Sequence, residues 1–207
     1  MQALELDNVA MAFGSRVLFE GLSARVKAGH TVVVTGANGS GKSTLLKIVA
    51  GLARPEAGIV RIVGKTGARV EAATERRHYL GYAAPDVQLY GELTGDENVL
   101  FFARLRGTAI DVSELLTRVG LSRGRGSDRV SEYSSGMRHR LKLAVSLIGS
   151  PSLLIWDEPT ATLDPDGAKI VDALLAAHGR AGGIAVVATN DPAEAERWGD
   201  VRIHVGR

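Results

Sequence analysis

The sequence contains no cysteine, which excludes disulfide bonds, thiol catalysis and cysteine-ligated metal sites and fits a reducing compartment. The five histidines are scattered along the chain, so the sequence gives little support for a histidine metal site. No run approaches the roughly 18 apolar residues of a membrane-spanning helix, and the first residues lack the basic and apolar segments of a secretory signal. We therefore expect neither a membrane span nor a signal peptide.

An excess of charge of one sign is also missing. The 25 basic and 23 acidic residues leave a formal net charge of +2, which argues against a general nucleic-acid binder, so no nucleic-acid partner is expected. Apolar residues make up 45% and charged residues 23% of the chain, values that exclude a disordered or collagen-like protein. With 207 residues and no internal repeat, the chain is expected to form a single domain over residues 1–207.

Hydrophobic periodicity predicts the order of strands and helices. Two period-2 segments, 3–13 and 17–26, open the chain and indicate an antiparallel pair. Further strands are predicted at 31–34, 59–63, 153–156, 184–188 and 201–205, and helices at 42–50, 96–105, 112–119, 134–148 and 165–177. Buried strands alternating with helices predict an α/β fold with a mainly parallel sheet, an antiparallel β subdomain at the N-terminus and an inserted helical lobe. The core is expected at about 1–84 and 151–207, and the lobe at about 85–150.

A glycine-rich loop lies between the strand at 31–34 and the helix at 42–50. It reads Gly36-Ala37-Asn38-Gly39-Ser40-Gly41-Lys42-Ser43-Thr44. Glycines allow the backbone N–H groups to wrap a polyphosphate, the lysine reaches the terminal phosphates, and the hydroxyl of Ser43 holds Mg²⁺. The pattern predicts a P-loop NTPase core whose residues 36–44 bind a nucleotide with Mg²⁺. By itself the motif does not separate kinases, GTPases and motor ATPases.

Two adjacent carboxylates, Asp157 and Glu158, follow the buried strand at 153–156. Asp157 suits the magnesium shell and Glu158 suits polarising an attacking water, as hydrolysis of a γ-phosphate requires. The alternative is an acidic turn without a chemical role. Farther along, Asp164 precedes Pro165 and is expected to cap the next helix.

The segment Tyr133-Ser134-Ser135-Gly136-Met137 opens a predicted helix shortly before these carboxylates and resembles the signature motif of ABC-type ATPases. The order of phosphate loop, helical insertion, signature, carboxylate strand and the Ala161-Thr162-Leu163-Asp164 loop is similar to that family over nearly the full chain. The resemblance implies that ATP lies between the phosphate loop of one subunit and the signature of another, in a head-to-tail dimer.

Under this resemblance Ser134, Ser135, Gly136 and Met137 contact the partner subunit's ATP, Asp164 lies in the dimer loop, and Phe13 stacks on adenine. Simpler explanations remain open for some of these residues, because Ser134 also suits a helix cap and Phe13 an ordinary strand aromatic. The partner can be an identical chain or a related ATPase subunit, and the sequence leaves this choice open.

Three positions depart from the family pattern. The signature keeps its serine and last glycine although it reads Tyr-Ser-Ser-Gly-Met instead of Leu-Ser-Gly-Gly-Gln, so its contact is expected to remain. Pro85 stands where the family has a glutamine that touches magnesium, and Gln88 is either a shifted metal contact or a surface residue. Asn190 replaces a histidine at the γ-phosphate, and an asparagine cannot store a proton. We expect intact ATP binding and slow hydrolysis, with Glu158 and Asn190 at the catalytic centre.

The family resemblance implies an ATP-binding and ATP-hydrolysing subunit that energises transport through separate transmembrane permease subunits, at the cytoplasmic face of the cell membrane. Leu89, Tyr90, Phe101 and Phe102 are candidates for the permease contact, with packing inside the lobe as the alternative. Residues 88–94 and 101–107 are similar to haem-exporter ATPase subunits associated with cytochrome c maturation.

Two other functions stay open. One is an ATP-gated interaction module with little hydrolysis, which the residues at positions 85 and 190 favour and Glu158 disfavours. The other is a soluble ABC-type ATPase not tied to transport. Chromosome-associated relatives would show coiled-coil heptads and translation-associated ones two phosphate loops, and neither pattern is found in this sequence.

Overall fold

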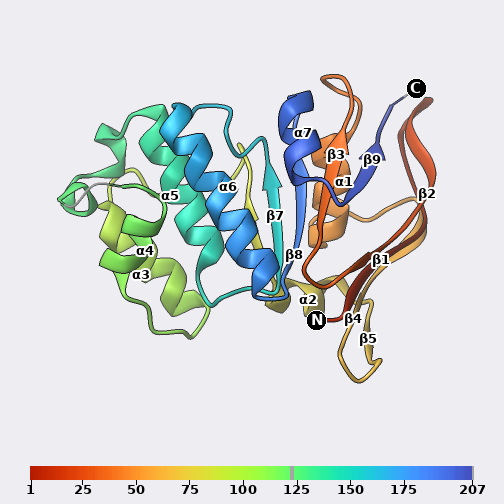
Figure 1. The fold of residues 1–207 in the computed structure, drawn as a ribbon, viewed down its shortest axis with the longest axis horizontal. Coiled ribbons are helices and arrows are strands. Elements are labelled where there is room, and N and C mark those ends of the chain that lie inside the picture. The colour runs from red at the N-terminus through yellow and green to blue at the C-terminus, as the bar shows by residue number, and fades with distance from the viewer. Residues whose placement is uncertain (122–123, 207) are drawn as a thin grey trace.

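The computed structural model describes residues 1–121 and 124–206, which form two β-sheets and a set of helices (Figure 1). The strands are β1 (Ala3–Phe13), β2 (Arg16–Lys27), β3 (Thr31–Thr35), β4 (Ala57–Val63), β5 (Arg69–Val70), β6 (Leu80–Ala83), β7 (Leu153–Asp157), β8 (Ile184–Ala188) and β9 (Val201–His204). The helices are α1 (Lys42–Ala50), α2 (Ala73–Arg76), α3 (Gly95–Leu105), α4 (Val112–Arg118), α5 (Ser135–Leu147), α6 (Pro165–Arg180) and α7 (Pro192–Trp198).

The strands divide between a parallel and an antiparallel sheet. The five-stranded sheet has the order β6-β7-β8-β3-β9, and its neighbouring strands all run parallel. The four-stranded sheet has the order β2-β1-β4-β5 and is antiparallel. The predicted fold class, an α/β core with an N-terminal antiparallel subdomain, is confirmed.

Strands of the parallel sheet supply side chains to two different hydrophobic cores. In β3, Val33 packs into the core on the side of α3 to α7, whereas Val32 and Val34 pack into the core shared by α1 and the antiparallel sheet. In β7, Leu154 and Ile155 divide in the same way. Successive side chains of a strand point to opposite faces, so a strand between two cores needs an unbroken apolar run. For this reason, the hydrophobic pattern of the sequence predicted these strands.

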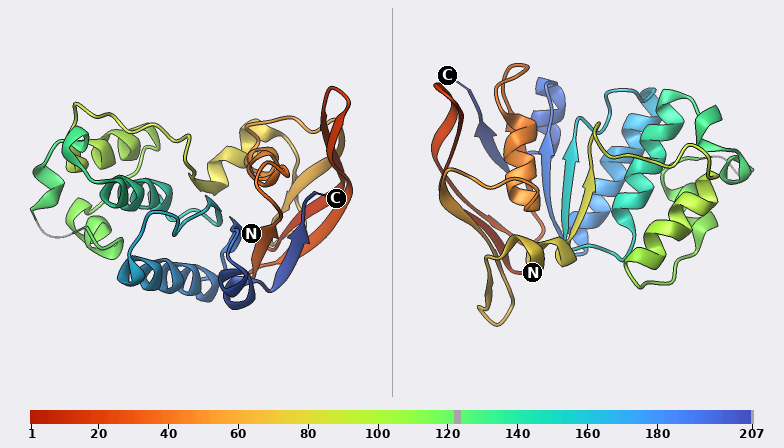
Figure 2. Two further views of the ribbon diagram at one scale, coloured as in Figure 1. Left: turned by 90° about the horizontal axis from the view of Figure 1, so that it is seen from above. Right: turned by 180° about the vertical axis from the view of Figure 1, so that it is seen from behind.

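Helices α3, α4 and α5 come from the chain between β6 and β7 and gather at the end of the molecule away from the antiparallel sheet (Figures 1 and 2). Helix α5 packs against β6, and α3 and α4 pack against α5. Residues 122 and 123 of the predicted lobe, and residue 207 of the predicted core, lie outside the described residues. Across the described chain, none of the helices has the length and apolar character needed to span a bilayer.

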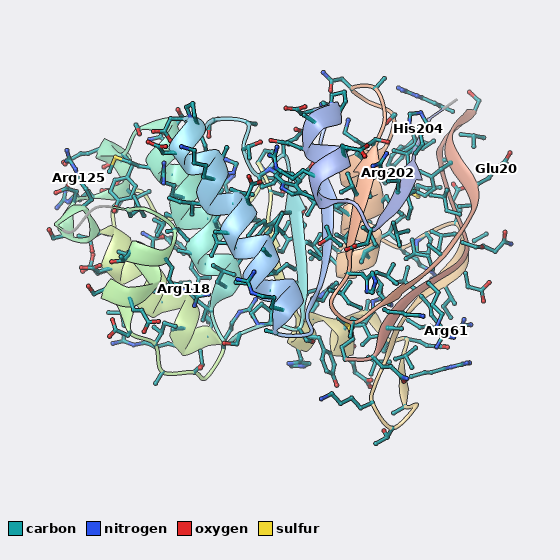
Figure 3. The ribbon with its side chains drawn as sticks, viewed as in Figure 1. Glu20, Arg61, Arg118, Arg125, Arg202 and His204 are labelled. Atoms are coloured by element: carbon teal, nitrogen blue, oxygen red, sulfur yellow. The ribbon has the colours of Figure 1, made fainter. Side chains whose placement is uncertain are left out.

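Charged side chains cover both ends of the molecule (Figure 3). On the outer face of the antiparallel sheet Arg61 pairs with Asp7 at 3.0 Å and with Glu71 at 2.6 Å. At the helical end Arg125 pairs with Asp128 at 2.8 Å. Exposed pairs of this kind contribute only about 0–1 kcal/mol each, so we interpret both faces as solvated surfaces.

Candidate functional site

The loop between β3 and α1 can be built only with glycine at its turning points. Gly36, Gly39 and Gly41 have φ angles of 146°, 76° and 111°, a region that side chains disfavour. A Cβ at Gly36 would lie 2.2 Å from the carbonyl oxygen of Val205. Val205 directly follows β9, the strand that carries Arg202 and His204 (Figure 3). Among the described residues no side chain caps the N-terminus of α1, so its first amides suit an anion.

This loop borders a cavity of about 650 Å³, a size typical of small-molecule sites. The ends of β1 and β7, the segment after β6 and the loop after β8 also line the cavity. Its lining consists of Phe13, Arg16, Leu18, Asn38, Gly39, Gly41, Lys42, Ser43, Thr44, Pro85, Asp157, Glu158, Ala161 and Asn190. The structure thus brings most of the predicted ATP-binding residues together with both predicted carboxylates and Asn190.

Three predicted phosphate-loop residues, Gly36, Ala37 and Ser40, do not line this cavity. Ala37 and Ser40 border a neighbouring hollow beside His204 and Val205. The hydroxyl of Ser40 is buried without a partner in the described chain and lies 2.6 Å from where a Cβ of Gly36 would stand. These residues therefore form the back of the loop and fix its shape.

The amine of Lys42 lies against the loop and against Asn190. It donates to the carbonyl oxygens of Gly36 at 2.8 Å and Ala37 at 3.3 Å, and to Oδ1 of Asn190 at 2.7 Å. Asn190 in turn donates from Nδ2 to Oδ1 of Asn38 at 2.8 Å. One amide side chain therefore contacts both the lysine and the phosphate loop, at the place where phosphate oxygens would have to compete for the same amine.

The two carboxylates stand at the end of β7. Asp157 is buried, and Glu158 follows it with a φ of 51° and with its N–H donating to the Ala188 carbonyl at 2.9 Å. Oε1 of Glu158 is buried and has no hydrogen-bond partner within the described residues. Burial raises the pKa of Glu158, opposed by a backbone hydrogen bond from Asn190 and by the charge of Lys42. An unpaired carboxylate oxygen beside a phosphate loop is positioned to accept a proton.

The sequence reasoning missed Arg16, which lies across the β1–β2 turn from Phe13. Its guanidinium donates from Nη2 to the Gly39 carbonyl at 2.8 Å, and Phe13 is 59% exposed at the rim of the cavity. The signal was the short Gly14-Ser15 turn, since a tight hairpin places the residues on either side of its turn opposite each other.

Pro85 lines the cavity, whereas Gln88 is exposed and does not. The amine of Lys142 on α5 holds this segment by donating to the carbonyl oxygens of Pro85 at 2.7 Å and Ala84 at 3.2 Å. Asp86 pairs with Lys47 of α1 at 2.7 Å. The structure therefore does not bring Gln88 to the site.

The predicted signature residues lie apart from this cavity. Ser134 caps α5 by accepting from the N–H of Met137 at 3.2 Å. None of the four signature residues, Ser134, Ser135, Gly136 and Met137, lines the cavity. Asp164 caps α6, accepting from the Gly167 N–H at 2.9 Å and from Arg140 at 2.8 Å. Within one chain these residues make local caps, so any role at a nucleotide needs a second subunit.

The oxygen donors around the cavity fit Mg²⁺ bound together with phosphate. The Ser43 hydroxyl and the Asp157 carboxylate line the same space, and Mg²⁺ is usually held by one or two protein oxygens plus phosphate and water. Within the described residues no three His, Cys, Asp or Glu side chains gather into a cluster.

Known proteins are similar to this chain in sequence. The family model described as ABC transporter matches residues 19–161. The cytochrome c biogenesis ATP-binding export protein CcmA of Vibrio parahaemolyticus is 35% identical, covering 90% of this chain and 91% of that protein. CcmA of Rhizobium etli is 37% identical and covers 91% and 88%. The Fe(3+) ions import ATP-binding protein FbpC 2 of Rhodococcus jostii is 34% identical over 96% of this chain but only 58% of its own length.

Solved structures share the fold. A dimeric ATP-binding cassette in a post-hydrolysis state, bound to ADP and Pi, superposes with a TM-score of 0.84 at 25% identity, covering 98% of this chain and 94% of that chain. The ATP binding subunit of an ABC transporter superposes with a TM-score of 0.85 at 27% identity, covering 98% and 85%. From its sequence, its fold and its phosphate loop, the chain belongs to the ABC transporter family as one of the ATPase subunits.

Proposed function

We propose that the chain binds ATP with Mg²⁺ in the cavity at the phosphate loop and hydrolyses it to drive transport through separate permease subunits. The observation that carries this proposal is the common lining of one cavity by residues 41–44, Asp157, Glu158 and Asn190. The ring of Phe13 is exposed at its rim and available to stack on the adenine.

In the proposed reaction the amine of Lys42 leaves Asn190 and the Gly36 carbonyl and takes phosphate oxygens as its new partners. The Ser43 hydroxyl and the Asp157 carboxylate would hold the Mg²⁺, whose charge would offset that of the phosphates. Glu158 accepts a proton from a water whose oxygen attacks the γ-phosphorus while the bond to the β-phosphate oxygen breaks. The products are ADP and phosphate.

Asn190 plays a positioning part in this scheme. Its Nδ2, which now donates to Asn38, can donate to a γ-phosphate oxygen, but the amide has no titratable proton. Without a proton-storing group at position 190, transition-state charge is neutralised less completely. We infer that turnover is slow while ATP affinity is retained.

The functional unit in this proposal is a head-to-tail dimer, formed with an identical or a related subunit. Ser134, Ser135, Gly136 and Met137 then face the partner's nucleotide, and Asp164 lies beside the dimer interface. The exposure of Ser134 and Ser135 at the N-terminus of α5 supports this, because a helix N-terminus attracts phosphate.

The proposed membrane partner is a permease at the inner face of the cell membrane. Tyr90 is 49% exposed and stacks edge-on against Phe101 with ring centroids 4.8 Å apart, which makes this pair the favoured contact. Leu89 and Phe102 are partly buried against the helical core, so packing accounts for them. For the cargo, export tied to cytochrome c biogenesis is favoured over iron import, because the chain matches those relatives over nearly their whole length.

The first test is ATP turnover of the purified protein against Glu158→Gln, with size exclusion in ATP and Mg²⁺. We expect the wild type to hydrolyse ATP, and the variant to stop and accumulate as a dimer. If both bind ATP and neither turns over, even with the permease present, the chain is an ATP-gated binding module. If turnover persists without Glu158, the assignment of the base is wrong.

A further inference from the structure

Glu194 is a buried acid on α7 that the mechanism above does not use. The side chain is 6% exposed, and both carboxylate oxygens accept hydrogen bonds from hydroxyl groups. Thr160 donates to Oε1 and Thr189 donates to Oε2, each at 2.5 Å. Burying a carboxylate costs free energy unless hydrogen bonds compensate, and here both oxygens are satisfied by hydroxyl donors.

The two threonines belong to the two loops that carry the proposed catalytic groups. Thr160 follows Glu158 by two residues, within a turn in which the N–H of Ala161 donates to the Glu158 carbonyl at 3.2 Å. Thr189 directly precedes Asn190, is 1% exposed, and its hydroxyl also accepts from the N–H of Asp191 at 3.0 Å. One carboxylate therefore joins the segment after β7 to the segment after β8.

We propose that Glu194 is a positioning residue whose carboxylate holds these two loops at a fixed separation and thereby places Glu158 and Asn190 around the γ-phosphate. This inference rests on the hydrolysis proposed above. Helix α7 does not need Glu194 as its anchor, because Ala195 and Trp198 already pack that helix into the core. The two loops, by contrast, are joined through Glu194, because each donates one hydroxyl hydrogen bond to its carboxylate.

The expected kinetic signature is a loss of turnover without a loss of ATP binding. A displacement of a catalytic group by about 1 Å can cost up to about a hundredfold in rate, whereas Glu194 does not line the cavity. We expect Glu194→Ala and the isosteric Glu194→Gln to lower kcat by about tenfold or more, with KM and the ATP dissociation constant within about threefold of wild type. The Gln variant preserves side-chain volume in case the Ala variant does not fold.

The matched control lies on the same helix. Glu196 has 76% of its side chain exposed and pairs with Arg202 at 2.6 Å, so Glu196→Gln and Glu196→Ala should leave kcat and KM unchanged. If Glu194 acts through Thr160, the double variant Thr160→Val/Glu194→Gln should be no slower than Glu194→Gln alone, whereas independent effects would multiply.

Amide hydrogen exchange without nucleotide supplies a readout that does not depend on activity. Glu194→Gln should accelerate exchange in both segments, 158–164 and 188–191, and Glu196→Gln in neither. Unchanged kcat, a matching loss of ATP affinity, or faster exchange confined to α7 would overturn the inference. Absence of turnover in the wild type would refute the hydrolysis proposal instead, while the exchange pattern would still decide whether Glu194 holds the two loops.

Discussion

At the residue scale, we expect the side chain at position 190 to limit the rate of ATP hydrolysis. Asn190 accepts from Lys42 and donates to Asn38, but its amide neither takes up nor releases a proton. A titratable donor at this place can take part in proton transfer, which contributes about a hundredfold or more when well placed. Steady-state turnover of Asn190→His should therefore exceed wild-type turnover by about tenfold, with ATP affinity little changed.

The control for this substitution is Asn190→Gln, which keeps the amide and its donor. It should not raise turnover. A gain of less than about twofold for Asn190→His would refute the idea that position 190 limits the rate, because proton-transfer groups normally contribute far more.

Arg16 carries a separate residue-scale prediction about ATP binding. It lines the cavity beside Phe13 and donates to the Gly39 carbonyl at 2.8 Å, so it both braces the phosphate loop and adds positive charge. Removing a hydrogen bond to a charged group costs about 1.5–3 kcal/mol. Calorimetry should find that Arg16→Met weakens ATP binding by about tenfold while kcat at saturating ATP is retained.

Arg25 offers a matched control, since it lies on the same strand, is exposed and pairs with Glu5 at 3.2 Å away from the cavity. Arg25→Met should bind ATP as tightly as wild type. Equal losses for the two variants would mean that the effect is general to the sheet and not specific to Arg16.

At the element scale, the predicted strands and helices that recur in the structure are those with a strong local pattern. β8 is an unbroken apolar run, β3 contains three consecutive valines, and α6 begins at the predicted Asp164 cap with proline in its first turn. β6 and α2, of four residues each, were missed because a glycine interrupts the apolar run of β6 and α2 is only about one turn long. The seven residues of α7 were missed although Asp191 and Pro192 give a start signal.

Which sheet a strand joins, and which distant residues meet, could not be predicted in the same way. β4 reads as one more apolar strand, yet it pairs with β1 in the antiparallel sheet. The contact of Glu194 with Thr160 spans 34 positions, and nothing in the local sequence marks it. Such contacts depend on strand order, which hydrophobic pattern does not specify.

Gly36 permits a direct test of how closely β3, the phosphate loop and β9 must approach. Ala at this position would place Cβ 2.2 Å from the Val205 carbonyl at a φ of 146°. Gly67 also has a positive φ, 82°, but open space around it, so Gly67→Ala measures the backbone strain alone, about 1–2 kcal/mol. In denaturant titrations Gly36→Ala should lose about 2 kcal/mol more than Gly67→Ala; equal losses would contradict this packing.

His178 at the end of α6 makes stability depend on pH. Its Nε2 lies 3.0 Å from the Ile184 carbonyl, and its ring fills the space above Gly183. Burial lowers the pKa of His178, partly offset by that hydrogen bond. The unfolded chain then takes up the proton more readily than the folded chain. The contribution of His178 to the free energy of unfolding should therefore be fully present above the unfolded pKa of about 6.5 and fall as the pH drops below it.

The measurement is the melting temperature of wild type and His178→Gln between neutral and mildly acidic pH. His139 also has a lowered pKa, caused first by burial, but it is present in both proteins and cancels in the difference. The wild type should lose more stability on acidification than the variant. Parallel pH curves would show that His178 is not the group responsible.

At the scale of the whole molecule, the parallel sheet gathers the site. β3, β7 and β8 run parallel as neighbours, so the phosphate loop, the Asp157–Glu158 pair and Asn190 follow three strands at the same edge. Ligands of open α/β sheets bind beyond these carboxyl ends. This is why most members of the site could be predicted from short motifs, whereas Arg16 comes from the antiparallel sheet and is marked only by the Gly14-Ser15 turn.

Within one chain, the signature residues stand apart from the cavity at the phosphate loop. Ser134 and Gly136 begin α5, outside the lining of the cavity, and Gly136 lies against the loop before Asp164, where an added Cβ would be 3.1 Å from the Thr162 carbonyl. A γ-phosphate bound by one chain alone would stay exposed to water, which weakens every electrostatic contact to it. A second subunit can supply both the missing helix N-terminus and the cover.

If each site needs the phosphate loop of one chain and the signature of another, two inactive variants should complement each other. Lys42→Ala removes the first function and Ser134→Arg the second, and each homodimer should be inactive. In an equal mixture half of the dimers are mixed, and each mixed dimer has one site with both functions intact. Turnover should then recover to about a quarter of wild type if the sites act independently. No recovery, with mixed dimers verified by tagged pull-down, would exclude sites shared between identical chains.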